Sequence, residues 1–278
     1  MTPAGTLALY CLIIAGASLT GGWLPSRWKL THTRMQVIMS FVSGLMLGVA
    51  LFHMLPHGSA KLRSFHDGGY WMAGGILGMF LLIRVFHVHS HGEAGTDCDG
   101  APHGHGHRAS GFGVLAGLTI HSLLDGIALA AAVTADARFA DSSMFFGIAT
   151  FIAVLAHKPL DSLSISSVMA AGGWSVRTRA LVNLLYAVTV PIGATLFAFG
   201  MRDAGDATVG AALCFAAGLF LCIALADLLP EIQFHDHDRL KLTVALLVGL
   251  AFAFAIDAMH PHEGQRTSPL VERMTGGK

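Results

Sequence analysis

Charged residues are scarce in this chain of 278 residues, since Asp, Glu, Lys and Arg together make up only 12% of it. Soluble domains carry about 25% charged residues, so this composition argues against a soluble globular protein. Seventeen basic residues balance seventeen acidic ones, which excludes the basic surface that nucleic-acid binding requires. With 54% hydrophobic residues and a mean hydropathy of +0.62, the chain belongs in a lipid bilayer.

Cysteine is also scarce. The four cysteines, Cys11, Cys98, Cys214 and Cys222, form no C-x-x-C pair, and three of them lie inside apolar runs. This pattern excludes a disulfide framework and a zinc finger. The first apolar run lacks a preceding basic segment and a small-residue cleavage site, so we expect a retained helix rather than a signal peptide.

Long apolar stretches are what the sequence has in abundance. A bilayer core of roughly 30 Å needs about 20 such residues per helix. Eight stretches meet this requirement, at residues 5–23, 35–56, 70–87, 111–134, 144–171, 178–200, 207–232 and 240–258. We therefore predict an all-α integral membrane protein with one transmembrane domain, residues 1–278, and a Gly- and His-rich loop at residues 88–110.

The distribution of basic residues predicts how the chain is oriented. Nine Lys and Arg residues fall on the side of the 88–110 loop, whereas four fall in the short connections of the other side. The positive-inside rule therefore predicts that the loop lies in the cytoplasm and that both termini lie on the opposite, external side of the membrane.

Two His/Asp pairs stand near the centres of the fourth and fifth spans: His121 with Asp125, and His157 with Asp161. On an α-helix this spacing puts both side chains on one face, about 6 Å apart along the axis. Ionisable groups at mid-membrane are costly and rare, so we expect the pairs to face each other and form one site. Two imidazoles and two carboxylates suit Zn²⁺ and also accept Fe²⁺, Mn²⁺, Co²⁺ or Cd²⁺. The alternative for each residue is a structural role, in which its side chain forms a hydrogen bond that joins two neighbouring helices.

At these residues the chain resembles the ZIP family of metal transporters, whose fourth and fifth spans carry His-x-x-x-Glu/Asp metal motifs. The eight spans, the His-rich loop after the third span and the external termini resemble that family too.

Some members of this family hold two metals, and the resemblance assigns the additional ligand positions to Ser122, Lys158 and Val190. Lysine and valine do not complete a second site, so we expect a single metal. We expect Lys158 to replace the second cation electrostatically; its alternative is to extend toward another carboxylate or a water-filled cavity.

A repeated pattern relates the second and seventh spans. The second ends in His53-Met-Leu-Pro-His57 and the seventh in Asp227-Leu-Leu-Pro-Glu231, and the two spans point in opposite directions. This predicts an inverted 3+2+3 repeat, with spans 1–3 related to spans 6–8 around spans 4 and 5. His53 and His57 then lie toward the outer mouth of a transport pathway, and Asp227 and Glu231 toward the cytoplasm.

The loop histidines predict a capture surface for metal at the cytoplasmic exit. They are His87, His89, His91, His103, His105 and His107. Flexible histidines alternating with small residues collect metal with modest affinity. The alternative is an incidental polar tract.

The function these features predict is transport of divalent metal, zinc first, into the cytoplasm across the cell membrane. Zinc is then the transported substrate, and no cofactor is expected. The expected partners are the metal ion and the lipid bilayer; nucleic acid is excluded, and a homodimer stays open. The alternative function is that of a zinc-dependent intramembrane hydrolase, in which a carboxylate activates a metal-bound water.

Overall fold

The structure is a computed structural model that describes residues 2–23, 31–87, 106–139, 147–234 and 239–259, and within these ranges only the backbone of residues 23, 32, 87, 106–111, 139 and 227–234. All regular structure in this part of the chain is helical. The elements are α1 (Pro3–Trp23), α2 (His32–Gly48), the π-helix η2 (Val49–Met54), α3 (Leu55–Leu62), α4 (Phe65–His87), α5 (Gly106–Phe139), α6 (Ile148–Ala171), α7 (Val176–Ala187), α8 (Thr189–Gly200), α9 (Asp206–Phe234) and α10 (Arg239–Ala258).

Eight helical stretches within the described residues are long and apolar enough to cross a membrane. They run over Pro3–Gly22, Thr33–Leu62, Phe65–Phe86, Phe112–Arg138, Ile148–Ala171, Val176–Gly200, Asp206–Ala226 and Arg239–Ala258. The predicted all-α membrane architecture with eight spans is confirmed. The inverted repeat and the external position of the termini stay predictions.

Proline interrupts two of these spans. Pro56 has no N–H to donate to the carbonyl of Phe52, and the chain before it forms η2, where the Leu55 N–H bonds to the Ala50 carbonyl. Pro191 likewise deprives the Ala187 carbonyl of its donor, and the sixth span is divided at Val188 into α7 and α8. The Thr189 hydroxyl donates to the carbonyl of Tyr186 at 2.7 Å, which satisfies one of the carbonyl groups at the break.

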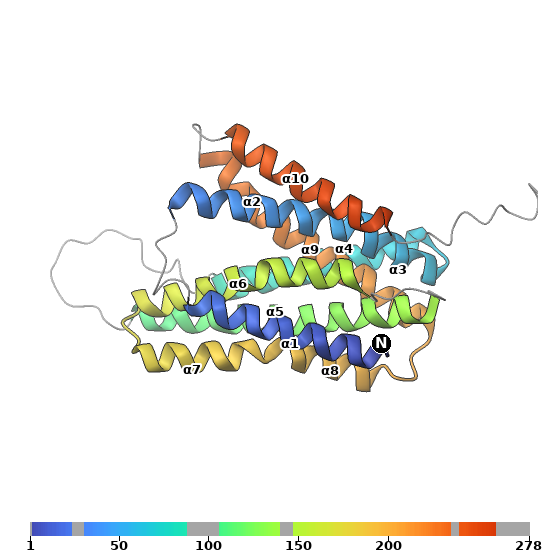
Figure 1. Cartoon of the computed structure of the whole chain (residues 1–278), viewed down its shortest axis with the longest axis horizontal. Coiled ribbons are helices and arrows are strands. Elements are labelled where there is room, and N and C mark those ends of the chain that lie inside the picture. Colours follow the sequence, from blue (N-terminus) through green and yellow to red (C-terminus); the bar gives the residue numbers. More distant parts are fainter. Residues whose placement is uncertain (1, 24–30, 88–105, 140–146, 235–238, 260–278) are drawn as a thin grey trace, which may run out of the picture.

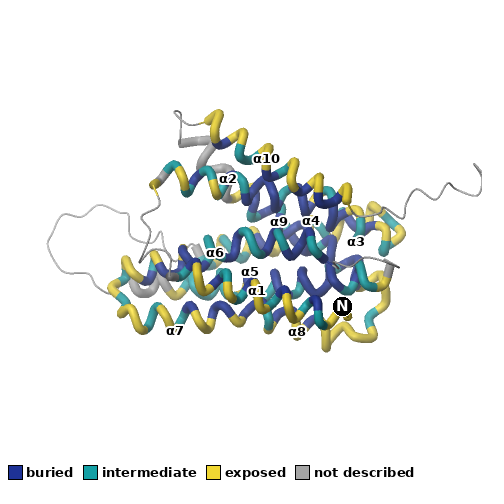
Figure 2. The backbone as a smooth tube through the Cα atoms, in the orientation of Figure 1, coloured by how far each residue is buried: buried dark blue, intermediate teal, exposed yellow. Residues whose placement is uncertain are grey.

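The helices pack in two groups. In one, α2 lies against α10, and α3 and α4 lie against α9. In the other, α1 lies against α6 and α7, and α5 lies against α8. Figure 1 shows α2, α9 and α10 above α5, α1, α7 and α8, and contacts of α9 with α5 and of α2 with α6 join the two groups. In Figure 2 the buried sides of the helices turn inward, while exposed residues cover the outer faces that lipid contacts.

Small residues bring α8 close to α5. A Cβ atom at Gly126 would collide with the carbonyl oxygen of Val190, and one at Gly193 would collide with that of Leu123. Such reciprocal glycine contacts allow two membrane helices to approach backbone to backbone. They fix α8 beside the segment of α5 that carries His121 and Asp125.

Candidate metal site

Helices α5 and α6 bring the four predicted side chains together. His121 and Asp125 lie on α5, His157 and Asp161 lie on α6, and the spacing of four residues turns each pair to one side of its helix. His121, Asp125 and His157 are buried, whereas the Asp161 side chain is 15% exposed. One ligand atom from each residue lies within 4.8 Å of the other three. Asp161 therefore marks the more accessible side of the site.

The distances between these ligand atoms suit a small ion. Asp125 Oδ2 lies 3.4 Å from His121 Nε2 and 3.2 Å from His157 Nε2, and Asp161 Oδ2 lies 3.7 Å from His121 Nε2. A tetrahedral zinc ion with ligands at about 2.0–2.2 Å keeps them roughly 3.3–3.6 Å apart. The three printed separations are therefore close to those of a tetrahedral zinc site.

The tautomer of His157 is fixed by a backbone contact. Its Nδ1–H donates to the carbonyl oxygen of Ala153 at 2.7 Å, because a carbonyl can only accept. In the neutral ring, Nε2 then carries the lone pair that faces Asp125 Oδ2 at 3.2 Å. Two acceptors face each other here, so a proton or a metal ion has to lie between them. The buried Nδ1 of His121 has no partner among the described residues.

Lys158 places a cation beside both carboxylates. Its Nζ donates to Asp125 Oδ2 at 3.0 Å and to Asp161 Oδ2 at 3.3 Å, and its side chain is fully buried. The ammonium therefore lies between both carboxylates and does not extend out of the site. Its role in place of a second cation stays a prediction.

Tyr186 of α7 is a member of the site that the sequence did not identify. Its hydroxyl donates to Asp161 Oδ2 at 3.0 Å, and its ring centroid lies 4.9 Å from Lys158 Nζ. Tyr186 lies in the last turn of α7, just before the break at Val188. The sequence signals this break only through Pro191, and it does not indicate which side chain the break turns toward the site. Tyr186 thus fixes the orientation of the Asp161 carboxylate.

The other two positions that the family resemblance assigned to a second metal have different contacts. The Ser122 hydroxyl pairs with the Thr189 hydroxyl. Val190 is fully buried against Gly126 and offers no ligand atom. Neither position adds a charged ligand to the four-residue site.

The predicted pathway residues have separate outcomes. His53 is buried and His57 half-buried, and both lie close to Asp257 of α10, which the sequence analysis did not single out. Asp257 could have been noticed as an acidic residue in the last turn of an apolar span. The side chains of Asp227, Glu231, His87 and His107 are not described, although these residues belong to helices. His89, His91, His103 and His105 of the loop prediction lie outside the described residues.

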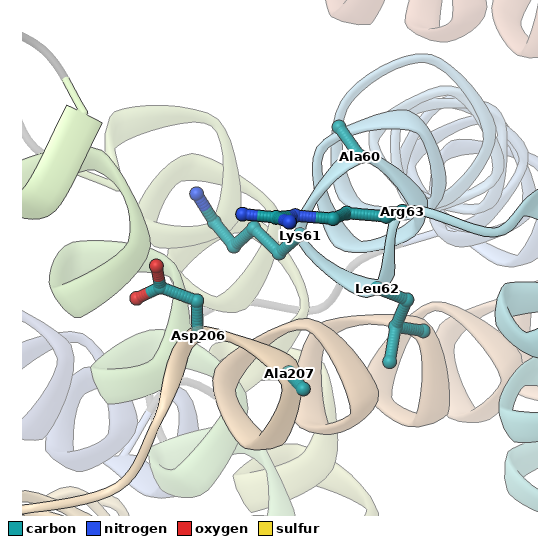
Figure 3. A pocket seen from close by; sticks show the side chains of 6 residues that line it. All are labelled: Ala60, Lys61, Leu62, Arg63, Asp206 and Ala207. Atoms are coloured by element: carbon teal, nitrogen blue, oxygen red, sulfur yellow. The ribbon is translucent and has the colours of Figure 1, made fainter.

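A hollow of about 340 Å³ lies away from this site, where α3 ends and α9 begins. Figure 3 shows Lys61 and Arg63 of the α3 end above Asp206 of α9. Because two of its lining residues are basic and one is acidic, the hollow is a poor place for a metal cation.

Comparison with known proteins gives one family. Residues 86–257 match the model of the ZIP zinc transporter family. Zinc transporter ZIP10 of Mus musculus is 31% identical over 150 residues, which are 51% of this chain and 17% of that protein. Zinc transporter ZIP4 of Mus musculus is 25% identical over 267 residues, covering 73% of this chain and 39% of that protein. Zinc transporter ZIP9 of Micropogonias undulatus is 22% identical over 317 residues, covering 94% of this chain and all of that protein.

These matches differ in extent, since the chain spans less than a fifth of the length of ZIP10 and all of ZIP9. The family match nevertheless covers more than half of the chain, and it includes α5 and α6 with the four clustered side chains. The chain therefore belongs to the ZIP family of zinc transporters.

Proposed function

We propose that this integral membrane protein carries a divalent transition metal, zinc first, into the cytoplasm through one ion site formed by His121, Asp125, His157 and Asp161. The observation that carries the proposal is the convergence of four ligand atoms on one point, in which His157 Nε2 and Asp125 Oδ2 face each other at 3.2 Å in a buried place. Either a proton or a metal ion satisfies these two atoms, and the four converging ligands favour the metal ion. Fe²⁺, Mn²⁺ and Cd²⁺ suit the same ligands.

A single ion is favoured over two. Lys158 already contributes a positive charge next to both carboxylates, and Ser122 and Val190 add no negative charge. A second divalent ion would meet the ammonium at close range, and repulsion in a buried site is strong. Lys158 therefore supplies, in place of a second metal, the positive charge next to the carboxylates.

The pathway runs between the two sides of the membrane. Metal enters past His53 and His57, reaches the central site, and leaves toward Asp227, Glu231 and the loop histidines. Transport requires the central site to face each side in turn. The packing of α1, α5, α6, α7 and α8 as one group supports a movement of that group against the other.

The alternative of a zinc-dependent intramembrane hydrolase is less well supported. A catalytic zinc keeps one open position for water. Here four ligand atoms converge and Lys158 fills the adjoining space. Membership of a family of transporters also favours transport.

Uptake of Zn²⁺ or Cd²⁺ into liposomes containing the purified protein tests the proposal. We expect saturable flux that His121→Ala and Asp161→Ala abolish. His66→Ala is the matched control, because His66 is an exposed histidine outside the site. Metal binding without flux in the parent protein, or equal flux in the parent and both site variants, would contradict transport through this site.

A further inference from the structure

A second group of side chains that can bind a metal lies outside α5 and α6, the two helices that carry the central site. It consists of His53 of η2, His57 of α3 and Asp257 of α10. One ligand atom from each residue lies within 4.8 Å of the other two. His53 is 2% exposed and Asp257 6% exposed. Burying these polar side chains within apolar spans costs considerable free energy.

The π-helix brings the two histidines into contact. Their ring centroids lie 4.4 Å apart, and the Nδ1–H of His57 donates to the His53 carbonyl oxygen at 2.7 Å. In the neutral His57 ring, Nε2 then carries the lone pair. His157 of the central site has the same arrangement, with Nδ1–H bonded to the carbonyl four residues earlier. A backbone bond of this kind orients a histidine and makes it a better metal ligand.

Close packing of α10 on α2 places Asp257 beside His53. A Cβ atom at Gly44 would collide with the Leu246 carbonyl, and one at Gly48 would collide with the side chain of Ala253. Because these contacts follow one another in the same order on both helices, α2 and α10 run in the same direction. Further along the pair, Asp257 Oδ1 lies 3.3 Å from His53 Nδ1. The third ligand thus comes from a helix that is distant in the sequence.

We propose that His53, His57 and Asp257 hold a divalent metal ion in a second site, which receives the ion before the central site does. Two imidazoles and one carboxylate bind zinc and its congeners and leave a coordination position for water or for ligand exchange. Such a site suits an ion in transit. Figure 1 shows α3 and the N-terminus of α1 at the same end of the molecule, the end predicted to face outside.

The order of the two sites rests on the proposed function, whereas metal binding at this cluster does not. The competing explanation is a hydrogen bond between His53 and Asp257 that only ties α10 to η2. Binding and flux are therefore measured separately.

Cadmium binding by the full-length protein tests the second site. In the background variant, His121→Ala and His157→Ala remove the central imidazoles and leave the Lys158 ion pairs in place. The six loop histidines are changed to serine to reduce binding there. Equilibrium dialysis followed by elemental analysis gives the cadmium bound per chain.

We expect the background variant to retain cadmium, and addition of Asp257→Ala or His57→Ala to remove about one ion per chain. Addition of His66→Ala removes none. Loss of stability with Asp257→Ala but unchanged cadmium in both cluster variants would show a structural hydrogen bond and overturn the proposal. These outcomes are independent of flux, so failure of the second site is distinguishable from failure of transport.

Discussion

Lys158 Nζ lies 3.0 Å from Asp125 Oδ2, the same oxygen that faces both histidines of the central site. The ammonium and an incoming metal ion therefore compete for one carboxylate oxygen. Without metal, the ammonium balances buried negative charge that would otherwise destabilise the fold. With metal, the ammonium is a neighbouring positive charge that weakens binding.

Replacement of the ammonium separates these two effects. We expect Lys158→Met to bind Zn²⁺ about tenfold more tightly or better, because a competing cation is lost, and to unfold at a lower temperature without metal. Isothermal titration and thermal unfolding in detergent measure the two quantities. Lys61→Met, at the end of α3, is the control for loss of one positive charge. Unchanged zinc affinity in both Lys158→Met and Lys158→Ala would remove this role of the lysine.

The hydroxyl of Tyr186 offers a test of ligand orientation. Tyr186→Phe keeps the ring beside Lys158 and deletes the hydrogen bond to Asp161. Loss of such a supporting bond typically weakens metal binding by about 10–100-fold, and we expect an effect within that range. Tyr10→Phe is the matched control, since the buried Tyr10 hydroxyl has no partner among the described residues and lies in α1. Equal zinc affinities for the two variants would show that Tyr186 does not orient Asp161.

The contact of α5 with α8 predicts a packing effect. Gly126→Ala places a methyl group against the Val190 carbonyl, and we expect a loss of about 1–3 kcal/mol in stability together with weaker zinc binding. Gly16→Ala is the control, because the added carbon would meet no atom of another segment within 4 Å. In that helix alanine is expected to be neutral or to stabilise by about 0.5–1 kcal/mol. Similar melting temperatures of the two variants would contradict the proposed close approach.

Local spacing predicted the parts of the site that one helix determines. The interval of four residues in His121/Asp125 and His157/Asp161 fixes which side chains share a face. The matching depth of the two pairs then predicted that they meet. Apolar length alone predicted the eight spans.

Contacts between distant segments could not be predicted in this way. Asp257 reaches His53 only because α10 packs along α2, and Tyr186 reaches Asp161 only because the sixth span is broken at Val188. A proline in a span predicts an irregularity, but not whether the chain forms a π-helix, as before Pro56, or a break, as before Pro191. These outcomes depend on tertiary packing.

Anomalous diffraction from crystals grown with zinc is the most direct test of the central site. We predict a peak that lies about 2.0–2.2 Å from one atom each of His121, Asp125, His157 and Asp161, with Lys158 Nζ moved away from Asp125. Zinc peaks elsewhere in the molecule, with the Lys158–Asp125 contact intact and no density among these four side chains, would contradict the account.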